Sequence, residues 1–362
     1  TKKIILVNNV LYAATINNGV HKSTDNGLNW FSVNNGVPLS CNNLYSADDK
    51  IFALTDAGVF FTTNSGTNWA PMNNGLTGND LRTAALLKDG TTLFRGGYNG
   101  IFKSTDDGLS WTQTSFYGAQ KQVTCISKLN GTYFAGCTGT SPTFLKSTDN
   151  FNSWTMLRFF QTFSPEVFDI YIEGNDMYLG TGHGVHRTSN LGANWTMLND
   201  GLGADPYVSS IIRVGTNLFC TQVFGGRGLF RSHNNGVNWE DVSGDYIHFS
   251  DMNDVFNVDN KIFVATGSAI YYQPQSNLTV VSPGSVNIVS SYNLHQNYPN
   301  PFNPVTSIKY SLPQNQFVKI NVYDISGKFV NELVNGYKLA GEHNVNFNAL
   351  SLPSGIYFYE LQ

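Results

Sequence analysis

The sequence predicts an all-β protein that consists of a repeat domain, residues 1–283, and a small C-terminal β-sandwich. Three observations support this prediction. An eight-residue box of the form Ser/Thr-x-Asp/Asn-x-Gly-x-Asn/Ser-Trp recurs along the first domain, beginning with STDNGLNW at residues 23–30. Only 13% of the 362 residues are charged and 35 are Gly, a composition that suits short strands and tight turns. The last box ends at Trp239, and after Pro283 the sequence changes in character.

The spacing of the boxes indicates the type of repeat. All six Trp residues end a box, and consecutive Trp residues are 39, 42, 43, 41 and 44 residues apart, the period of a four-stranded repeat. Residues 278–283 can supply the outer strand of a further repeat without a box. Seven repeats of this size fill about 290 residues, so we expect a seven-bladed β-propeller, with six blades as the alternative. A shared strand pattern occurs seven times, at residues 11–15, 51–55, 92–96, 133–137, 177–181, 218–222 and 262–266.

Each box is expected to be a tight turn between two strands. The Asp or Asn at its third position can accept hydrogen bonds from N–H groups of the turn, and the Gly two residues later provides a positive φ. The Trp then packs against the neighbouring strand. In the fourth box Phe151 replaces this Gly, which predicts a looser turn. The structural residues assigned to the boxes are Asp25, Asn64, Asp106, Asp149, Asn190, Asn234, Trp30, Trp69, Trp111, Trp154, Trp195 and Trp239.

The box resembles the Asp-box, or BNR repeat, and the resemblance extends over roughly residues 1–283. Proteins with such repeats include sialidases, sortilin-type receptors, xyloglucan-degrading glycosidases and photosystem assembly factors. The resemblance implies a β-propeller whose boxes lie on the rim, away from the active site, and serve the fold. A calcium site at the box carboxylates is disfavoured, because the turn is short and no Glu follows at the spacing of an EF-hand loop.

Composition and motifs disfavour several other classes of function. The net charge is −4 and basic residues form no cluster, which argues against nucleic-acid binding. No apolar run approaches the ~18 residues that a membrane-spanning helix needs. The four Cys residues lack zinc-site spacing and no cofactor motif occurs, so no metal and no cofactor are expected. Across a turn at residues 130–131, Cys125 is expected opposite Gly136, which favours free thiols over a Cys125–Cys137 disulfide.

A ligand-binding face is predicted where the repeats are interrupted. The connections at residues 114–122, 157–168, 199–207 and 243–251 break the pattern, and we expect them to gather around the mouth of the central channel. Aromatic side chains on loops held by a rigid scaffold suit a polysaccharide or an envelope protein, although individual rings can instead seal gaps between blades. The candidate residues are Phe116, Tyr117, Phe159, Phe160, Phe163, Tyr207, Tyr246 and Phe249.

Two carboxylates suggest an alternative function. Asp169 and Asp254 lie twelve residues before the ends of the shared strand pattern in the fifth and seventh repeats, which places them early in the innermost strands. A carboxylate pair near a channel mouth is what a glycosidase needs, so a glycoside hydrolase or lyase is the alternative to a binding protein. Other repeats carry Lys3, Asn43, Cys125 and Ser210 at the equivalent position.

Residues 294–362 follow a linker at residues 284–293 and predict a small Ig-like β-sandwich. The motifs QNYPNPFNP (296–304), VYDISGK (322–328) and LPSGIYFY (352–359) closely resemble the C-terminal sorting domain of the type IX secretion system of Bacteroidetes. By alternation of apolar and polar residues, strands are expected at residues 307–312, 318–323, 345–347 and 356–361.

The resemblance implies that the type IX machinery is a partner of residues 294–362. It also implies that the protein is secreted or displayed on the outer surface of a Gram-negative bacterium. Such domains usually continue into one more strand, so we expect this one to lack its last strand. The resulting open edge can accept a strand from another copy. A structural subunit of an extracellular assembly or filament is therefore a second alternative function.

Overall fold

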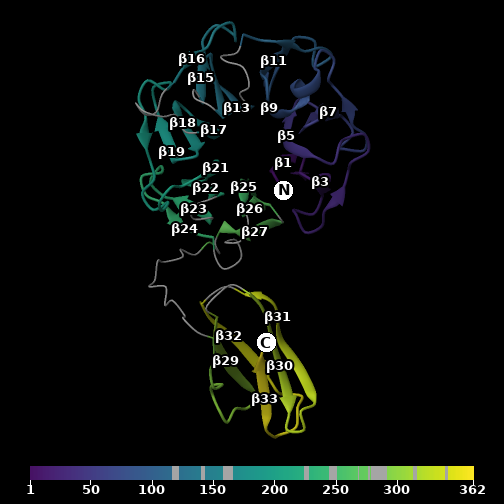
Figure 1. The fold of residues 1–362 in the computed structure, drawn as a ribbon, viewed down its shortest axis with the longest axis vertical. Coiled ribbons are helices and arrows are strands. Elements are labelled where there is room, and N and C mark those ends of the chain that lie inside the picture. The colour runs from purple at the N-terminus through teal and green to yellow at the C-terminus, as the bar shows by residue number, and fades with distance from the viewer. Residues whose placement is uncertain are drawn as a thin grey trace. The chain divides into compact units, whose positions relative to one another are not determined.

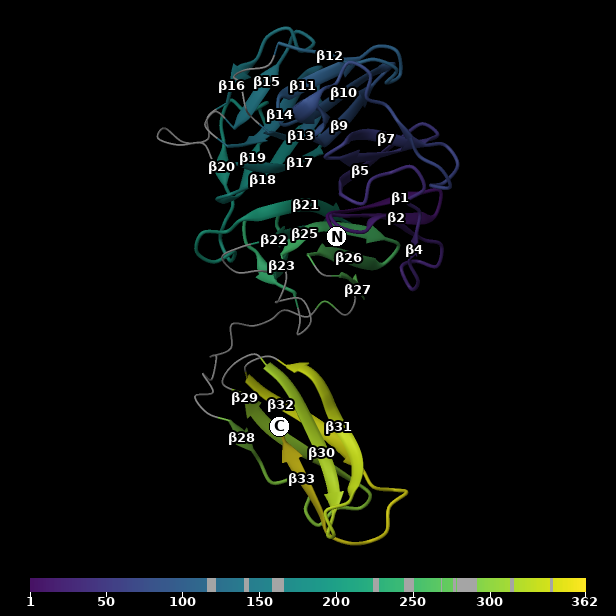
Figure 2. The ribbon, with the colours of Figure 1, turned by 45° about the vertical axis from the view of Figure 1, so that its right-hand side comes forward.

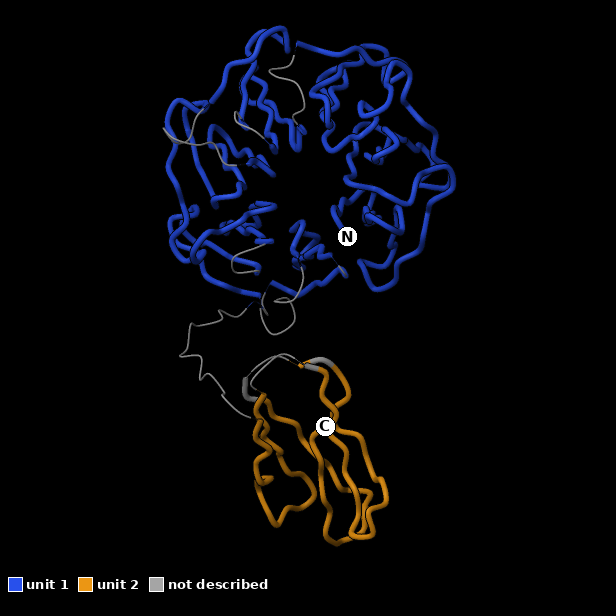
Figure 3. The backbone as a smooth tube through the Cα atoms, viewed as in Figure 1, with its two compact units in different colours: residues 1–281 blue, residues 282–362 orange. Residues whose placement is uncertain are grey.

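The computed structural model describes residues 1–115, 122–139, 143–157, 166–223, 228–243, 251–267, 269–275, 278, 292–312, 316–338 and 341–362. The chain forms two compact units, Thr1–Val281 and Ser282–Gln362 (Figure 3). The described elements are strands, apart from the short 3-10 helix η1 (Gly78–Leu81). The prediction of an all-β protein is therefore confirmed.

In unit 1 the described strands form seven antiparallel sheets that follow one another along the chain. The first two contain β1 (Lys3–Val7), β2 (Val10–Thr15), β3 (Gly19–Ser23) and β4 (Phe31–Ser32), then β5 (Cys41–Ala47), β6 (Lys50–Thr55), β7 (Gly58–Thr62) and β8 (Ala70–Pro71). The next two contain β9 (Thr83–Asp89), β10 (Thr92–Gly97), β11 (Gly100–Ser104) and β12 (Thr112–Gln113), then β13 (Gln122–Leu129), β14 (Thr132–Thr138), β15 (Phe144–Ser147) and β16 (Thr155–Met156).

The fifth and sixth sheets contain β17 (Val167–Glu173), β18 (Asp176–Thr181), β19 (Gly184–Thr188) and β20 (Thr196–Met197), then β21 (Val208–Val214), β22 (Asn217–Gln222), β23 (Gly228–Ser232) and β24 (Glu240–Asp241). The seventh has three described strands, β25 (Met252–Val258), β26 (Lys261–Thr266) and β27 (Ile270–Pro274). Each copy of the shared strand pattern lies in the second strand of one sheet. Of residues 278–283, expected as a further outer strand, only Leu278 is described.

The seven sheets close into a ring (Figure 1). The first strand of each sheet lies on the inside and contacts the first strand of the next sheet, and β25 contacts β1. In sheets two to seven a β-bulge near the start of the first strand shifts its pairing with the second strand. Such bulges re-aim side chains, and here they act beside the centre of the ring.

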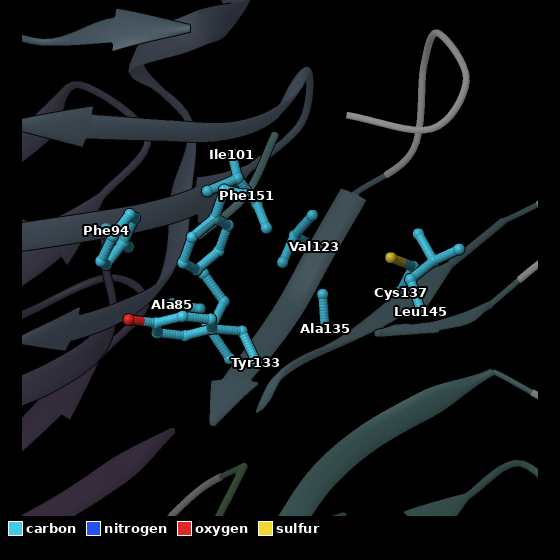
Figure 4. Close-up of a cluster of buried hydrophobic side chains, with 10 residues drawn as sticks. Ala85, Phe94, Ile101, Val123, Tyr133, Ala135, Cys137, Leu145 and Phe151 are labelled. Carbon is cyan, nitrogen blue, oxygen red and sulfur yellow. The ribbon is translucent and has the colours of Figure 1, made fainter. Parts of the chain in front are cut away.

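The hydrophobic core is divided among the seams between neighbouring sheets. In Figure 4, Phe94 and Ile101 of the third sheet pack near Val123 and Tyr133 of the fourth. Equivalent clusters fill the other six seams, including the one that joins the first and seventh sheets. Because every seam buries apolar side chains from both of its sheets, the ring is stabilised around its whole circumference.

The boxes adopt the same turn in all six copies. Two consecutive residues have positive φ, as at Asn26 (55°) and Gly27 (85°). The hydroxyl of Ser23 accepts from the N–H of Gly27 at 2.9 Å and donates to Asp25 Oδ1 at 2.7 Å, and Asp25 Oδ1 also accepts from the N–H of Asn29 at 2.9 Å. The side chains of the box thus satisfy N–H groups that a turn of this shape leaves unpaired.

The prediction of a looser turn in the fourth box is wrong. Phe151 has a φ of 69°, and its N–H donates to Ser147 Oγ at 3.0 Å, as the Gly does in the other boxes. Its ring is 1% exposed and stacks on Phe94 with 3.9 Å between the ring centroids (Figure 4). A positive φ costs Phe about 1–2 kcal/mol. Burial of the aromatic ring, worth roughly 1.5–3 kcal/mol by transfer, offsets that cost.

A second local motif, which the sequence analysis did not predict, connects neighbouring sheets at three of the seams. The connections at residues 34–36, 73–75 and 199–201 read Asn-Asn-Gly or Asn-Asp-Gly. The first Asn accepts from a strand N–H of its own sheet, as Asn73 Oδ1 does from Val59 at 2.8 Å, and the Gly lies against the backbone of the Trp in the next sheet. These are the seams at which the Trp is buried and its indole N–H donates to a backbone carbonyl, namely Trp69, Trp111 and Trp239.

The described strands of unit 2 form two three-stranded sheets (Figure 2). One contains β28 (Asn293–Leu294), β29 (Val305–Leu312) and β32 (Gly341–Asn348), and the other contains β31 (Phe329–Lys338), β30 (Gln316–Asp324) and β33 (Tyr357–Leu361). Strands β29, β30, β32 and β33 cover the four expected strands, whereas β28 and β31 were not predicted. Among the described strands β33 pairs only with β30, so it is an edge strand. Its pairing with a strand of another copy remains a prediction.

The predicted register between β13 and β14 is confirmed, because Cys125 lies opposite Gly136. All four Cys residues are free thiols. Cys41, Cys137 and Cys220 are buried, and Cys125 lies at the inner side of the ring, where it takes part in the site described next. Burial raises the pKa of the Cys41 thiol to about 12, which leaves it unreactive at neutral pH.

Candidate functional site

The candidate site is an axial cavity of about 370 Å³ at the inner side of the ring. Residues on the first strands of all seven sheets line it, so it is enclosed laterally by the ring itself. Its wall is formed by seven residues, one from the first strand of each sheet, each paired with a residue of the second strand. In six of the seven sheets a β-bulge directly precedes this residue. These positions are Lys3, Asn43, Ala85, Cys125, Asp169, Ser210 and Asp254.

Asp254 joins the seventh sheet to its two neighbours. Its Oδ1 accepts from Lys3 Nζ at 2.8 Å and from Ser210 Oγ at 3.0 Å, and its Oδ2 accepts from the N–H of Ile4 at 3.0 Å. Lys3 and Ile4 belong to the first sheet and Ser210 to the sixth. The carboxylate is 1% exposed, and a buried carboxylate needs such partners. Asp254 therefore closes the ring between its last and first sheets.

Asp169 makes the same kind of connection one seam away. Its Oδ2 accepts from the N–H of Ile211 in the sixth sheet at 2.7 Å, and its Oδ1 accepts from the N–H of Ile170 at 2.9 Å. Burial raises the pKa of Asp169, against the opposing effect of Lys3 and of these N–H groups. Burial acts to lower the pKa of Lys3, but Asp254 and Asp169 raise it overall, so Lys3 carries its charge at neutral pH.

Uncharged polar side chains also connect neighbouring sheets beside the cavity. Asn43 Nδ2 donates to the carbonyl of Ala84 at 2.8 Å. At the bulges, Thr124 Oγ1 lies 2.5 Å from the carbonyl of Val167, and Ser209 Oγ lies 2.5 Å from that of Met252. The sequence offered a signal for this set, since a polar residue directly precedes the ring position in several repeats. Sequence reasoning noted the ring position and missed its function at the seams.

The structure describes one of the eight aromatic residues assigned to the ligand-binding face. The ring of Tyr207 packs on Phe168 at 4.5 Å between centroids, and its hydroxyl lies 3.1 Å from Glu166 Oε2. Phe168 lines the axial cavity, so this pair extends from the cavity wall to the connection that precedes β21. The other seven, Phe116, Tyr117, Phe159, Phe160, Phe163, Tyr246 and Phe249, lie outside the described residues.

The strands that follow the interrupted connections all begin near the axial cavity. The connections before β13, β17, β21 and β25 all join the N-terminal ends of first strands, where the bulges and the seven wall positions also lie. The first strands that follow these connections therefore begin at the end of the ring where the axial cavity lies. Phe168 and Glu166 were part of one predicted connection, but their association with Tyr207 depends on the packing of two adjacent sheets.

In the described part of the chain, no three His, Cys, Asp or Glu side chains are grouped as a metal ion would require. The same residues contain no helix that is long and apolar enough to cross a membrane.

Residues 296–362 match the family model of the secretion system C-terminal sorting domain. This match shows a secreted or outer-surface protein of the Bacteroidetes type, with a domain that directs it to the export machinery. No curated protein matches the chain.

Solved structures resemble the chain at low sequence identity. The extracellular domain of a one-component system from B. thetaiotaomicron is 12% identical, with a TM-score of 0.62, over 99% of this chain and 54% of that chain. A GH74 xyloglucanase from Xanthomonas campestris is 13% identical, with a TM-score of 0.60, over 74% and 50%. YCF48 bound to a D1 peptide is 14% identical, with a TM-score of 0.58, over 76% and 92%. These likenesses show the fold alone: the protein contains a β-propeller.

Proposed function

We propose that this exported protein is a binding protein that takes a carbohydrate into the axial cavity of a seven-bladed propeller. In this interpretation each of the seven sheets is one blade, the boxes are Asp-box turns and unit 2 is an Ig-like sorting domain. The observation that carries the proposal is the cavity itself, which is lined by the first strands of all seven sheets.

The chemistry of the cavity supports a carbohydrate ligand. Its volume of about 370 Å³ lies near the lower end of the range for small-molecule sites, roughly 300–1,000 Å³. Amides, hydroxyls and charged groups line it, among them Asn42, Ser210 and Lys2, and these can exchange hydrogen bonds with sugar hydroxyls. The ring of Phe168, supported by Tyr207, offers an apolar surface of the kind that packs on the C–H face of a sugar.

The shape of the cavity supports entry of a chain end. Seven strands surround it, so a ligand must enter along the axis of the ring. The interior of a long polysaccharide has no lateral path into such a site, whereas a terminal sugar does. An envelope protein that presents an extended terminus is the alternative ligand with the same route.

The test incubates the full chain with plant, algal and bacterial polysaccharides. The amount of protein retained on each polysaccharide and the new reducing ends released from it are measured in the same samples. We expect retention without new reducing ends, and competition by short oligosaccharides that carry the same terminal sugar. Phe168→Ala is expected to weaken retention about tenfold or more, because it removes a stacking surface of order 1.4 kcal/mol. Phe31→Ala, which alters an exposed ring on β4, should leave retention unchanged. Retention that is insensitive to Phe168→Ala would contradict the cavity as the site.

A glycoside hydrolase or lyase is the second candidate, because Asp169 and Asp254 line one cavity in different environments. Burial raises the pKa of Asp169, which suits a general acid, and Asp254 forms an ion pair with Lys3 at 2.8 Å. Against catalysis, the oxygens of both carboxylates accept backbone N–H groups that hold the seams. New reducing ends that disappear in Asp169→Asn, with retention intact, would establish the enzyme in place of the binding protein.

A further inference from the structure

Unit 2 contains an open groove formed by three stretches that are far apart in the sequence. Two pockets of about 380 and 440 Å³ share the loop at residues 352–355 and Tyr357. Residues 300–304, 349 and 350 complete the first pocket, and residues 324, 325, 328–330 and 356 complete the second. We call this combined surface the loop groove. All of its residues lie within the segment 296–362 that matches the sorting-domain family.

We propose that the loop groove is the surface through which the secretion machinery binds this protein, and that its occupant is an apolar segment of a protein of that machinery. The inference concerns unit 2 and does not depend on the carbohydrate proposal. It rests on the composition of the groove, on its rigid walls and on the family match.

The groove exposes large apolar side chains that lie outside the described core clusters of unit 2. Leu350 is 78% exposed, Ile325 72%, Ile356 62% and Phe329 53%. Four large apolar side chains that share one groove of a small exported domain mark an interaction site. An apolar occupant buries these side chains and gains their transfer free energy.

Charge in the groove also favours an apolar occupant. The ionisable side chains of its lining are those of Asp324 and Lys328, apart from the phenol of Tyr357. Asp324 Oδ1 accepts from the hydroxyl of Ser326 at 2.6 Å and from the N–H groups of Lys328 at 3.1 Å and Ser326 at 2.9 Å. These hydrogen bonds lower the pKa of the carboxyl and engage it within its own turn. With one charge of each sign, the groove presents no net field that would select a charged ligand.

The walls of the groove are held in place by contacts with the core of unit 2. Phe302 and Tyr357 line the first pocket and both pack on Phe347, at 5.9 and 6.2 Å between ring centroids. The N–H of Ala349 donates to the carbonyl of Pro304 at 2.9 Å, and the hydroxyl of Tyr357 donates to that of Pro353 at 2.7 Å. A preformed groove of this kind binds without an additional ordering cost.

The family match identifies the kind of partner. A sorting domain directs export, so the machinery must contact a surface contained within it, whatever domain precedes it. The loop groove meets this requirement, because residues from the beginning, middle and end of the matched segment form it, all of them in unit 2. Three separate stretches of the segment that matches the family therefore meet at one surface.

The test is export of the full chain from a Bacteroidetes host with an active type IX system. The Ile325→Asp and Ile356→Asp double variant should reduce the ratio of exported to periplasmic protein about tenfold or more, as loss of central apolar contacts does at protein interfaces. Phe317→Asp is the matched control: Phe317 is 57% exposed and lies at the opposite end of β30 from Asp324, and its variant should be exported like the wild type. Equal export of all three proteins would overturn the proposal, as would equal loss in both variants.

Two further measurements distinguish the other outcomes. If the double variant is less resistant to proteolysis than the wild type, a photo-crosslinking side chain at position 356 replaces it. That probe should crosslink to an outer-membrane component of the machinery, and a probe at position 317 should not; the absence of that difference would overturn the proposal. If purified wild type is a dimer, the double variant a monomer and export unchanged, the occupant is a second copy of this chain and the proposal is wrong.

Discussion

The third residue of each box shows how one side chain fixes a turn. In the first box, Asp25 Oδ1 accepts from the N–H of Asn29, and in the second, Asn64 Oδ1 accepts from that of Asn68 at 3.0 Å. Carboxylate and amide thus serve equally as acceptors, but only the carboxylate titrates. Hydrogen bonds from Asn29 and Ser23 lower the pKa of Asp25 to about 2, and bonds from Ser104 and Ser110 lower that of Asp106 to about 2.

These lowered pKa values predict a contribution to acid stability. A carboxyl whose pKa is lower in the folded state stabilises the fold at pH values above its pKa in the unfolded state, about 3.9. This contribution is lost as the pH falls through the pKa of the folded state. Between about pH 4 and pH 2, the melting temperature of the triple variant Asp25→Asn, Asp106→Asn and Asp149→Asn should therefore decrease less than that of the wild type. Parallel pH profiles of the two proteins would show that the box carboxylates do not carry this dependence.

Phe151 predicts a case in which the consensus residue destabilises the protein. Phe151→Gly relieves the positive φ, worth about 1–2 kcal/mol, but removes a buried ring whose loss costs about 3–5 kcal/mol, so the free energy of unfolding should fall by about 1–4 kcal/mol. Asn150→Gly is the control, because Asn150 has a φ of 57° in the same turn and its side chain is exposed. Urea denaturation measures both. A stabilised Phe151→Gly variant would contradict the role of the aromatic cluster.

At the scale of elements, the fold depends on how each connection meets the next sheet. Gly36 has a φ of 91°, and a Cβ there would lie 2.3 Å from the carbonyl oxygen of Trp69. Likewise, a Cβ added at Gly201 would lie 2.0 Å from the carbonyl oxygen of Trp239. The Asn-Gly connections thus bring the backbones of neighbouring sheets into contact, which a side chain would prevent. The connections that carry most of the predicted aromatic face lack this motif, namely residues 114–122, 157–168 and 243–251.

Substitution of these glycines should therefore cost more than their φ alone. Gly36→Ala combines an unfavourable φ with a backbone clash, and is expected to lower the free energy of unfolding by about 2–4 kcal/mol. Gly90→Ala is the matched control, because Gly90 has a φ of 59° with no atom within 4 Å of the added Cβ, and should cost about 1 kcal/mol. Chemical denaturation of the two variants compares them. Equal losses would mean that the approach to Trp69 adds nothing.

At the scale of the whole molecule, the ring closes through residues that are remote in sequence. Asp254 accepts from the N–H of Ile4, a separation of 250 residues, and Lys3 pairs with the same carboxylate. The seventh seam therefore forms only when the first and last sheets are both present. Unit 2 has its own core around Ile320 and Phe347, which contains no residue of unit 1.

This division predicts independent unfolding of the two parts. Cleavage within residues 284–293 should give fragments 1–283 and 294–362 that unfold at the temperatures of the two transitions seen in the full chain. Differential scanning calorimetry of the full chain and both fragments measures this, with the uncut protein as the reference. A single cooperative transition in the full chain, lost on cleavage, would show that the units stabilise each other.

The sequence by itself determined the features that depend on local chemistry and period. The box spacing predicted the repeated sheets, a two-residue turn predicted the register of Cys125 against Gly136, and the terminal motifs predicted export. Each follows from residues close together in the chain, since turn geometry and alternation are local properties. The role of the boxes as turns follows in the same way, because their Asp, Asn and Gly residues have the hydrogen-bonding groups and the φ that a tight turn requires.

Only the tertiary structure decided how distant residues meet. It showed Phe151 in the same turn as Gly, because Phe94 of another sheet buries its ring. It revealed β31, whose apolar residues do not alternate simply, and it converted Asp169 and Asp254 from a candidate catalytic pair into groups that also hold the seams of the ring. The loop groove likewise joins stretches that only folding brings together. Contacts of this kind depend on packing between sheets, which no local pattern in one sequence specifies.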